Sequence, residues 1–229
     1  MSDHEPATIL SQVPLFSGLS ERQVQSFLSR VRTQHYRTGE VIFHKDEPGD
    51  TFHLILDGLV KIYLASEDGQ EAVLIILKPA EFFGELSLLD GAPRSASAMA
   101  LQPTVTCTIN RENFMSFIGE QPRAAMGFFA VLASRLRRAD GIIGDAAFLD
   151  LPARVAKVLL ELAENFGRRL PEGVEIDLRL RQQDVASMVS ATRESVNRTL
   201  ANLEEQGIIR TDRQRITILD GEALSHRIH

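Results

Sequence analysis

The sequence predicts an α+β protein built from a β-rich N-terminal part, a long helix and a C-terminal winged helix-turn-helix. Three observations support this fold class. Short β-rich runs separated by turn residues fill residues 39–110, apolar residues at helical spacing follow over 122–148, and a helix–turn–helix pattern lies within 183–204. We therefore expect parts spanning 1–121, 122–150 and 151–229, the middle one holding the long helix and a hinge.

The β-rich part contains five candidate strands at 41–43, 52–56, 59–64, 72–77 and 105–109. The breaks between runs contain the segment 46–50 and the Asp-Gly pairs at 57–58, 68–69 and 90–91. These residues tolerate the positive φ angles that tight turns require. Many short strands with regular turns predict a small jelly-roll-like β-roll.

Apolar residues of the long helix recur at alternating steps of three and four, as in the seam of two packed helices. The seam residues are Phe129, Leu132, Leu136, Ala139, Ile143 and Ala146. The same spacing also fits an amphipathic helix lying on its own domain, so both interpretations stay open at this point.

A second helix is predicted to begin after Asp150, a good helix cap, because Pro152 falls in its first turn. Its expected buried face ends before Gly167, and a glycine at this point predicts the C-terminal end of the helix. That face consists of Val155, Val158, Leu159, Leu162 and Phe166. The alternation of Val174, Ile176, Leu178 and Leu180 then predicts a short strand pair.

The segment 183–189, the turn 190–192 and the helix from Arg193 have the proportions of a helix-turn-helix. Thr192 can cap the second helix, whose expected core face is Val196, Leu200 and Leu203. We therefore expect its first two turns to expose Arg193, Glu194, Asn197 and Arg198. Arginine suits guanine and glutamate suits the cytosine amino group, although the same residues also fit a solvated face.

Two short runs at 208–210 and 215–218 predict a hairpin next to this motif. Arg210, Arg213 and Arg215 are then expected to be available for phosphates, which makes the motif winged. The chain carries a net charge of −6, but residues 151–229 contain twelve basic and twelve acidic residues. The C-terminal part is thus the one suited to nucleic acid.

Composition excludes several other classes of protein. A single cysteine, Cys107, cannot form a disulfide framework or a multi-thiolate iron–sulfur site, and His35, His44 and His53 are isolated. No signal-like N-terminus and no apolar run of roughly 20 residues is present, so we expect a cytoplasmic protein without a membrane span. The sequence shows no nucleophile–base motif and no metal-ligand cluster, and we expect neither an enzyme nor a metal site.

The segment 82–89, followed by Pro93-Arg94-Ser95-Ala96, combines the features of a phosphate site. Glycine permits close approach of the backbone, amides and a serine hydroxyl can hold phosphate oxygens, and an arginine supplies positive charge. Over nearly its full length the chain resembles the cyclic-AMP receptor protein and fumarate–nitrate regulator family of bacterial transcription regulators. The segment 82–89 is similar to that family's phosphate-binding cassette, and residues 193–198 are similar to its recognition helix.

The resemblance implies a cyclic-nucleotide-binding β-roll, a homodimer formed through the 122–148 helix, and RNA polymerase as a further partner. It implies that Arg193, Glu194 and Arg198 read a half-site similar to TGTGA in an inverted repeat. The other DNA-binding residues expected from it are Arg181, Gln183, Thr192, Asn197 and Arg213.

The resemblance also implies that Glu85 accepts from the ribose 2′-hydroxyl and that Arg94 and Ser95 hold the cyclic phosphate. The remaining ligand-binding residues expected from it are Gly84, Leu86, Ser87, Ala139 and Asp140. Ala139 and Asp140 replace a threonine and a serine that hold adenine in the cyclic-AMP receptor protein. A carboxylate can accept from both adjacent donors of guanine, so cyclic GMP and cyclic AMP both remain candidates.

Several alternatives stay open at this stage. Glu85 and Arg94 could form only an internal ion pair, and Asp140 could be a solvated charge or pair with Arg137. A cyclic dinucleotide, a regulator that needs no nucleotide, and a nucleotide-binding subunit acting on a protein partner are the competing functions.

Overall fold

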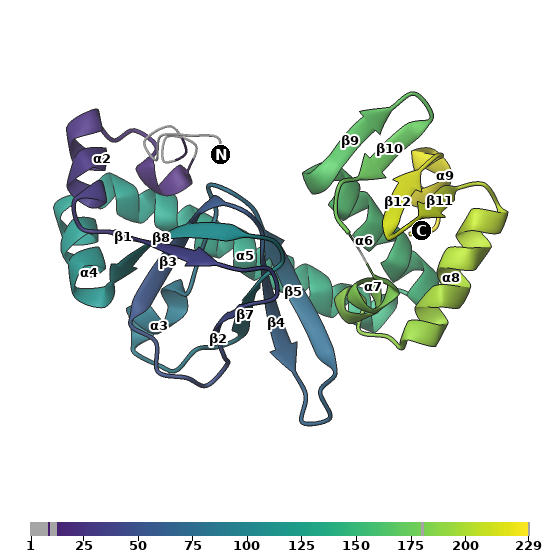
Figure 1. Cartoon of the computed structure of the whole chain (residues 1–229), viewed down its shortest axis with the longest axis horizontal. Coiled ribbons are helices and arrows are strands. Elements are labelled where there is room, and N and C mark those ends of the chain that lie inside the picture. The colour runs from purple at the N-terminus through teal and green to yellow at the C-terminus, as the bar shows by residue number, and fades with distance from the viewer. Residues whose placement is uncertain (1–8, 10–12, 180, 229) are drawn as a thin grey trace. The chain divides into compact units, whose positions relative to one another are not determined.

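The computed structural model describes residues 9, 13–179 and 181–228, and it divides into two compact units (Figure 1). The first unit comprises residues 1–68 and 73–137, and the second comprises 69–72 and 138–229. The division falls within the helix α5 (Pro122–Phe148), whose bounds match the predicted helix. The α+β class and the order of β-sheet part, long helix and helix-turn-helix are thereby confirmed.

The first unit contains two four-stranded sheets. One has the strand order β1 (Arg32–Tyr36), β8 (Thr104–Asn110), β3 (Thr51–Asp57), β6 (Phe82–Phe83). The other has the order β2 (Val41–Phe43), β7 (Ser97–Ala100), β4 (Val60–Ala65), β5 (Glu71–Leu77). All five predicted strands are present, whereas β1, β6 and β7 were not predicted. The strand β1 escaped prediction because its polar residues show no apolar alternation.

The strand β3 supplies side chains to two hydrophobic cores. Phe52 and Leu54 belong to the core that includes the helices of the first unit, whereas Ile55 belongs to the core between the two sheets. The strand β6 divides in the same way, with Phe82 in the first core and Phe83 in the second. Successive side chains of a strand point to opposite faces, so both strands are buried on both sides.

Helices cover the outer face of the first sheet. They are η1 (Pro14–Phe16), α2 (Glu21–Leu28), α4 (Arg111–Glu120) and the first turns of α5, while the short α3 (Glu85–Asp90) follows β6. Aromatic rings join these elements: Phe52 stacks on Phe114 with centroids 5.0 Å apart, and Phe82 stacks on Phe128 at 5.3 Å. This aromatic core fixes β6, and therefore the segment that follows it, against the helices.

The helix α5 is buried only at its beginning. Ala124 and Phe128 are buried, and Leu132 packs partly against the same core. Three seam residues at seven-residue intervals remain exposed: Phe129 at 57%, Leu136 at 65% and Ile143 at 69%. The expected seam is therefore an exposed apolar stripe of this helix.

The second unit begins with the last turns of α5 and the helix α6 (Leu151–Phe166), which Asp150 caps by accepting from the Ala153 amide at 2.9 Å. Its other elements are β9 (Gly167–Leu170), β10 (Gly173–Ile176), α7 (Gln182–Met188), α8 (Arg193–Glu205), β11 (Ile209–Asp212), β12 (Arg215–Ile218) and α9 (Gly221–Ser225). The strands form one sheet in the order β11-β12-β10-β9.

Three details of the second unit differ from expectation. Val158 and Phe166 are only half-buried, and β10 ends at Ile176, so Leu178 lies beyond the strand. Leu180 lies outside the described residues.

Two ion pairs tie the end of α5 to α6: Arg138 to Glu161 at 3.0 Å and Asp145 to Lys157 at 2.6 Å. Among the described residues, no helix is both long enough and apolar enough to cross a membrane.

Candidate functional site

The centre of the candidate ligand site is the buried side chain of Arg94, which is 5% exposed. Its Nη1 donates to the Gly84 carbonyl at 2.8 Å and its Nη2 donates to the Thr51 carbonyl at 2.9 Å. The guanidinium carbon lies 4.1 Å from the centroid of the Phe43 ring. Nε is buried and has no hydrogen-bond partner. Because a guanidinium has five N–H donors, donors remain for an anion.

Two glycines make room for this guanidinium. A Cβ on Gly84 would lie 2.7 Å from Arg94 Nη1, and a Cβ on Gly49 would lie 2.3 Å from Arg94 Nε. Gly84 also has φ +78°, which side-chain-bearing residues rarely adopt. We call Arg94 together with Phe43, Gly49, Thr51 and Gly84 the Arg94 seat.

Acidic residues surround the seat. Burial lowers the pKa of Arg94, and the nearby carboxylates of Asp50, Glu85 and Glu47 oppose that effect. Arginine stays charged under these conditions because its pKa starts so high. The seat therefore presents a buried positive charge with an unused donor, which suits an anionic group such as a phosphate.

Glu85 pairs with a residue that sequence reasoning did not assign to the site. Its carboxylate, in a residue 4% exposed, accepts from Arg135 Nη1 at 2.7 Å. Arg135 also donates to the Phe82 carbonyl and lies 4.8 Å from the Phe82 ring centroid. The sequence left open an ion pair between Glu85 and Arg94, whereas in the structure Glu85 forms its ion pair with Arg135. No local sequence pattern links Glu85 to Arg135; the general rule that a buried carboxylate requires a partner predicts a pairing but not which residue supplies it.

The other expected ligand residues are placed unevenly. Ser87 is buried, Leu86 is 44% exposed, and Ser95 is exposed beside the seat residue Arg94. Ala139 and Asp140 are exposed residues of α5, and both fall in the second unit. The structure therefore brings together Gly84, Glu85 and Arg94 within the first unit.

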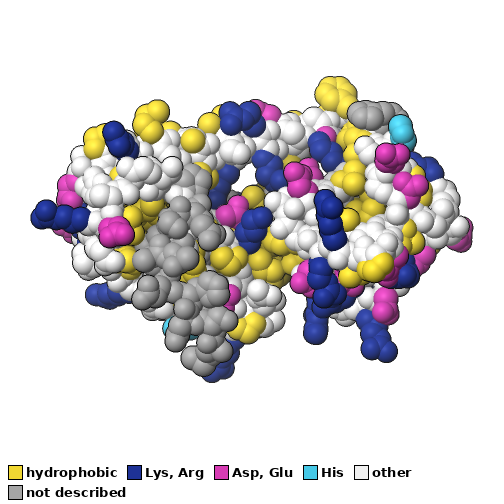
Figure 2. Space-filling model, turned by 90° about the horizontal axis from the view of Figure 1, so that it is seen from above, with side chains coloured by type: hydrophobic (Ala, Val, Ile, Leu, Met, Phe, Trp, Pro, Cys, Tyr) yellow, Lys and Arg dark blue, Asp and Glu magenta, His cyan; other side chains and the backbone are white. Residues whose placement is uncertain are grey.

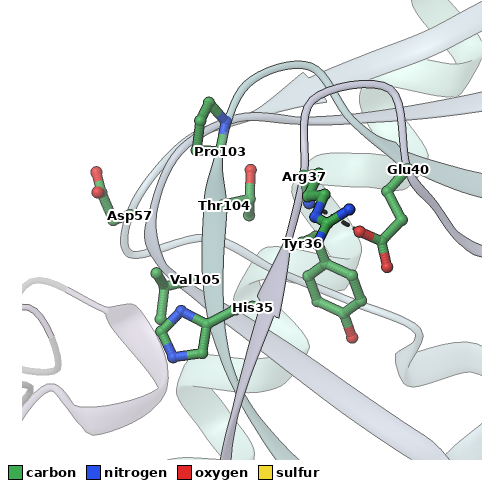
Figure 3. Close-up of a pocket in the computed structure, with 8 residues that line it drawn as sticks. All are labelled: His35, Tyr36, Arg37, Glu40, Asp57, Pro103, Thr104 and Val105. Atoms are coloured by element: carbon green, nitrogen blue, oxygen red, sulfur yellow. Dashed lines mark hydrogen bonds between the residues drawn. The ribbon is translucent and has the colours of Figure 1, made fainter.

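A separate hollow of about 700 Å³ opens elsewhere in the first unit (Figure 3). It is lined by His35, Tyr36, Arg37, Glu40, Asp57, Pro103, Thr104 and Val105. His35 lies beside Val105, its partner in register, and Tyr36 extends on the side of Glu40. Glu40 accepts from the Arg37 amide and Asp57 accepts from the Gly58 amide, so both carboxylates cap turns. The hollow contains none of the expected ligand residues.

The helix-turn-helix forms as expected. Thr192 caps α8 by accepting from the Ser195 amide at 3.3 Å, and Val196, Leu200 and Leu203 form the buried face. Within the second unit, Arg154 donates to the Val189 carbonyl at 3.0 Å and thereby ties α6 to the end of α7.

The exposed residues of the recognition face are Arg193, Glu194 and Arg198 on α8, with Arg181 and Gln183 at the start of α7. The expectation that Asn197 is exposed was wrong, since the residue is half-buried and its Oδ1 atom is buried without a partner. Asn197 directly follows buried Val196 and therefore lies at the edge of the buried face of the helix.

The wing hairpin β11–β12 is confirmed, but two of its arginines are already engaged. Arg210 pairs with Glu172 at 2.8 Å, and Arg215 pairs with Glu175 at 2.8 Å. Both pairs are partly exposed, so the availability of these arginines for phosphates stays a prediction. Arg213 is exposed in the turn, with φ +43°. Lys and Arg side chains gather along the lower edge of the second unit in Figure 2, at its right.

Among the described residues, no group of three or more His, Cys, Asp or Glu side chains is placed to hold a metal ion.

Comparisons with known proteins identify both parts of the chain. Residues 33–121 match the family model of the cyclic nucleotide-binding domain, and residues 153–227 match that of the Crp-like helix-turn-helix domain. A CRP-like cAMP-activated global transcriptional regulator of Mycobacterium tuberculosis is 34% identical over 219 residues, covering 96% of this chain and 98% of that protein. The cyclic AMP receptor protein of Thermus thermophilus is 36% identical over 197 residues, covering 86% and 88%.

Solved structures support the fold. The structure of the c-di-GMP-responsive global regulator CLP of Xanthomonas campestris has a TM-score of 0.79 and 23% identity, and covers 87% of this chain and 99% of that one. At this identity the likeness concerns the fold alone.

The close packing of Gly84 against Arg94 can be tested with two Gly→Ala variants. Gly69 has φ +76° and open space around it, so Gly69→Ala reports the backbone strain alone, on the order of 1–2 kcal/mol. Gly84→Ala adds clashes with Arg94 Nη1 at 2.7 Å and with the Thr51 carbonyl oxygen at 2.9 Å, and we expect a further loss of about 1–3 kcal/mol. Thermal or urea unfolding measures both. Equal losses would mean that neither Arg94 nor the Thr51 carbonyl lies against Gly84 as described.

Proposed function

The chain belongs to the cyclic-AMP receptor protein and fumarate–nitrate regulator family of transcription regulators, and from this premise we propose that it is a cyclic-nucleotide-responsive, sequence-specific DNA-binding regulator. In this proposal it acts as a homodimer on an inverted repeat with TGTGA-like half-sites. The observation that carries the ligand part is the buried guanidinium of Arg94, with an unpartnered Nε, close to the carboxylate of Glu85.

The proposed ligand is a purine cyclic nucleotide. Its phosphate would be held by Arg94 and Ser95, its ribose 2′-hydroxyl would donate to Glu85, and Gly84, Leu86 and Ser87 would line the cassette. A single phosphate diester matches a single buried guanidinium in charge. When the nucleotide binds at Glu85, it meets a carboxylate that already accepts from Arg135 of α5. Ligand binding is thereby coupled to the position of that helix.

The base is proposed to be read by Ala139 and Asp140 of α5. A carboxylate can accept from both N1–H and the 2-amino group of guanine, which favours cyclic GMP. The relatives named as cAMP-activated or cyclic-AMP receptor proteins favour cyclic AMP. We therefore propose cyclic GMP or cyclic AMP as the effector, with Asp140 setting the ratio of their affinities.

DNA reading is assigned to the exposed first turns of α8. Arg193, Glu194 and Arg198 would contact base edges, while Arg181, Gln183, Thr192 and Arg213 would contact the backbone. Half-buried Asn197 is retained as a residue at the edge of this interface. Arg210 and Arg215 each form an ion pair with a glutamate, so Arg213 is the wing's proposed phosphate contact.

The exposed stripe of α5 supports the homodimer. Phe129, Leu136 and Ile143 are each more than half exposed and recur every seven residues, as in two-stranded coiled coils. A two-fold protein matches an inverted repeat whose half-sites lie about 34 Å apart. The proposed organisation is then a ligand domain at 1–121, a dimer helix and hinge at 122–150, and a DNA-binding domain at 151–229.

The proposed mechanism is a shift between two arrangements of the dimer. Ligand at Glu85 and Arg94 would favour one packing of α5, and the hinge at 148–150 would set the spacing of the two recognition helices. A ligand can bias such an equilibrium only by its difference in affinity for the two states. The proposal includes a cytoplasmic location, RNA polymerase as a partner and no hydrolysis of the nucleotide.

A cyclic dinucleotide stays the alternative effector: the regulator named as c-di-GMP-responsive shares the fold of this chain, although that likeness concerns the fold alone. A regulator without nucleotide would leave Arg94 Nε without a role, and a nucleotide-binding subunit acting on a protein partner would leave the winged helix-turn-helix without one.

The first test is a calorimetric titration of nucleotide-free protein with cyclic GMP and cyclic AMP. Loss of hydrogen bonds to a charged group costs about 1.5–3 kcal/mol, so Asp140→Ser should lower the ratio of cyclic GMP to cyclic AMP affinity by roughly 10- to 100-fold. An unchanged ratio would show that Asp140 does not read the base. In a parallel titration with a cyclic dinucleotide, heat with that ligand alone would make it the effector in place of cyclic GMP or cyclic AMP.

The second test measures binding to a TGTGA inverted repeat by fluorescence anisotropy. Arg193→Ala should cost about 1–3 kcal/mol on this repeat and relax selectivity at one guanine. The control is Arg213→Asn, which suits the positive φ of the turn and should weaken binding to all sequences alike. If Arg193→Ala, like Arg213→Asn, lost the same affinity for the specific repeat and for random DNA, base reading by Arg193 would be contradicted.

The third test concerns the dimer. Ile143→Asp places a charge on the exposed apolar stripe and should convert the protein to monomers in analytical ultracentrifugation, because like charges would face each other across the seam. Ser134→Asp introduces the same charge on the opposite side of α5 and should leave the dimer intact. A monomeric native chain, or a dimeric Ile143→Asp variant, would contradict the proposed interface.

A further inference from the structure

One buried side chain beside the Arg94 seat has no part in the proposed ligand contacts. His53 of β3 is 5% exposed and lies opposite Phe83 of β6 in the strand register. Its imidazole is stacked on the Phe83 ring, with centroids 4.8 Å apart and an interplanar angle of 14°. Alternation along β3 places it on the same face as Ile55, toward the core between the two sheets.

His53 contacts or adjoins three supports of the Arg94 guanidinium: the Phe43 ring and the Gly84 and Thr51 carbonyls. Its ring lies 5.8 Å from the ring of Phe43, which in turn carries the guanidinium at 4.1 Å. Phe83, on which it stacks, immediately precedes Gly84, whose carbonyl accepts from Arg94. Thr51, which provides the other accepting carbonyl, lies two residues earlier in the same strand. A change in the size of the side chain at residue 53 would therefore shift the Phe43 ring and the two carbonyls that hold the Arg94 guanidinium.

The charge and the Nδ1 atom of His53 do not account for its place. Burial, together with the charge of Arg94, lowers the pKa of His53 to about 3, so the imidazole is neutral near pH 7. Its Nδ1 is buried and has no hydrogen-bond partner, an arrangement that destabilises a fold. What the residue contributes is a flat ring of limited size that contacts both Phe83 and Phe43, whose own rings lie 5.8 Å apart.

We infer that His53 is a positioning residue of the Arg94 seat. Its ring keeps Phe43 and Phe83 at the spacing that lets the guanidinium lie over Phe43 while bonding to the Gly84 and Thr51 carbonyls. The consequence for binding, which rests on the proposed function, is that the phosphate of a cyclic nucleotide meets Arg94 already oriented. Preorganisation of this kind raises affinity because less ordering remains to be done on binding.

The experiment compares His53→Phe with His53→Leu in calorimetric titrations with cyclic AMP and cyclic GMP. His53→Phe keeps a flat ring and removes the unpartnered nitrogen, so affinity should stay within threefold of the native protein. His53→Leu keeps an apolar side chain but removes the ring, and affinity should fall at least tenfold. Native-like binding by His53→Leu, or an equal loss in both variants, would overturn the inference.

A second variant covers the case in which His53→Leu does not fold. Phe43→Leu removes the half-buried ring directly beneath the guanidinium and should give the same loss of at least tenfold. Unchanged affinity in Phe43→Leu would overturn the inference.

A spectroscopic measurement separates this inference from the proposed function. The Nε–H resonance of Arg94, assigned by its absence in Arg94→Lys, should shift or broaden in His53→Leu but not in His53→Phe. If the native protein binds neither nucleotide, the proposed ligand fails while this signal still tests the position of Arg94. An Nε–H signal that is identical in the native protein and in His53→Leu would overturn the positioning role by itself.

Discussion

The need to accommodate one buried guanidinium shapes most of the first unit. Arg94 is withdrawn from water, so its donors require carbonyls, its charge requires nearby carboxylates, and its bulk requires neighbours without side chains. Gly84 and Gly49 meet the last requirement, and the carbonyls of Gly84 and Thr51 meet the first. These residues come from three separate segments of the chain. The two sheets and the aromatic core bring those segments together and leave the Nε atom without a hydrogen-bond partner.

The helix α5 bears charges whose partners differ along its length. Near its middle Arg135 binds Glu85 and the Phe82 carbonyl within the first unit. Further on, Arg138 and Asp145 pair with α6 within the second unit. The pairs in the second unit are partly exposed, and such pairs contribute only about 0–1 kcal/mol each. The buried pairing of Glu85 is the stronger constraint, because its carboxylate would otherwise lie desolvated without a partner.

Local patterns were sufficient to predict much of the fold and part of the site. Turn pairs, helix caps and heptad spacing located five strands, the helix 122–148 and the helix-turn-helix, because each depends on neighbours in sequence. The strand β1 and the partner of Glu85 escaped prediction, since an edge strand need not alternate and a contact between residues 85 and 135 has no local signature. The engaged state of Arg210 and Arg215 likewise depends on strand register.

The double burial of β3 limits which changes in chain length the protein can accept. Phe52 and Leu54 serve one core, while His53 and Ile55 face the other, so a single-residue insertion in β3 would exchange the two sets. Side chains that fit one core would then enter the other, on both sides of the strand at once. A similar insertion at Gly69, where nothing lies within 4 Å of an added side chain, would meet open space. Length variation among natural variants of this domain should therefore fall in the hairpin around residue 69 and be absent from β3.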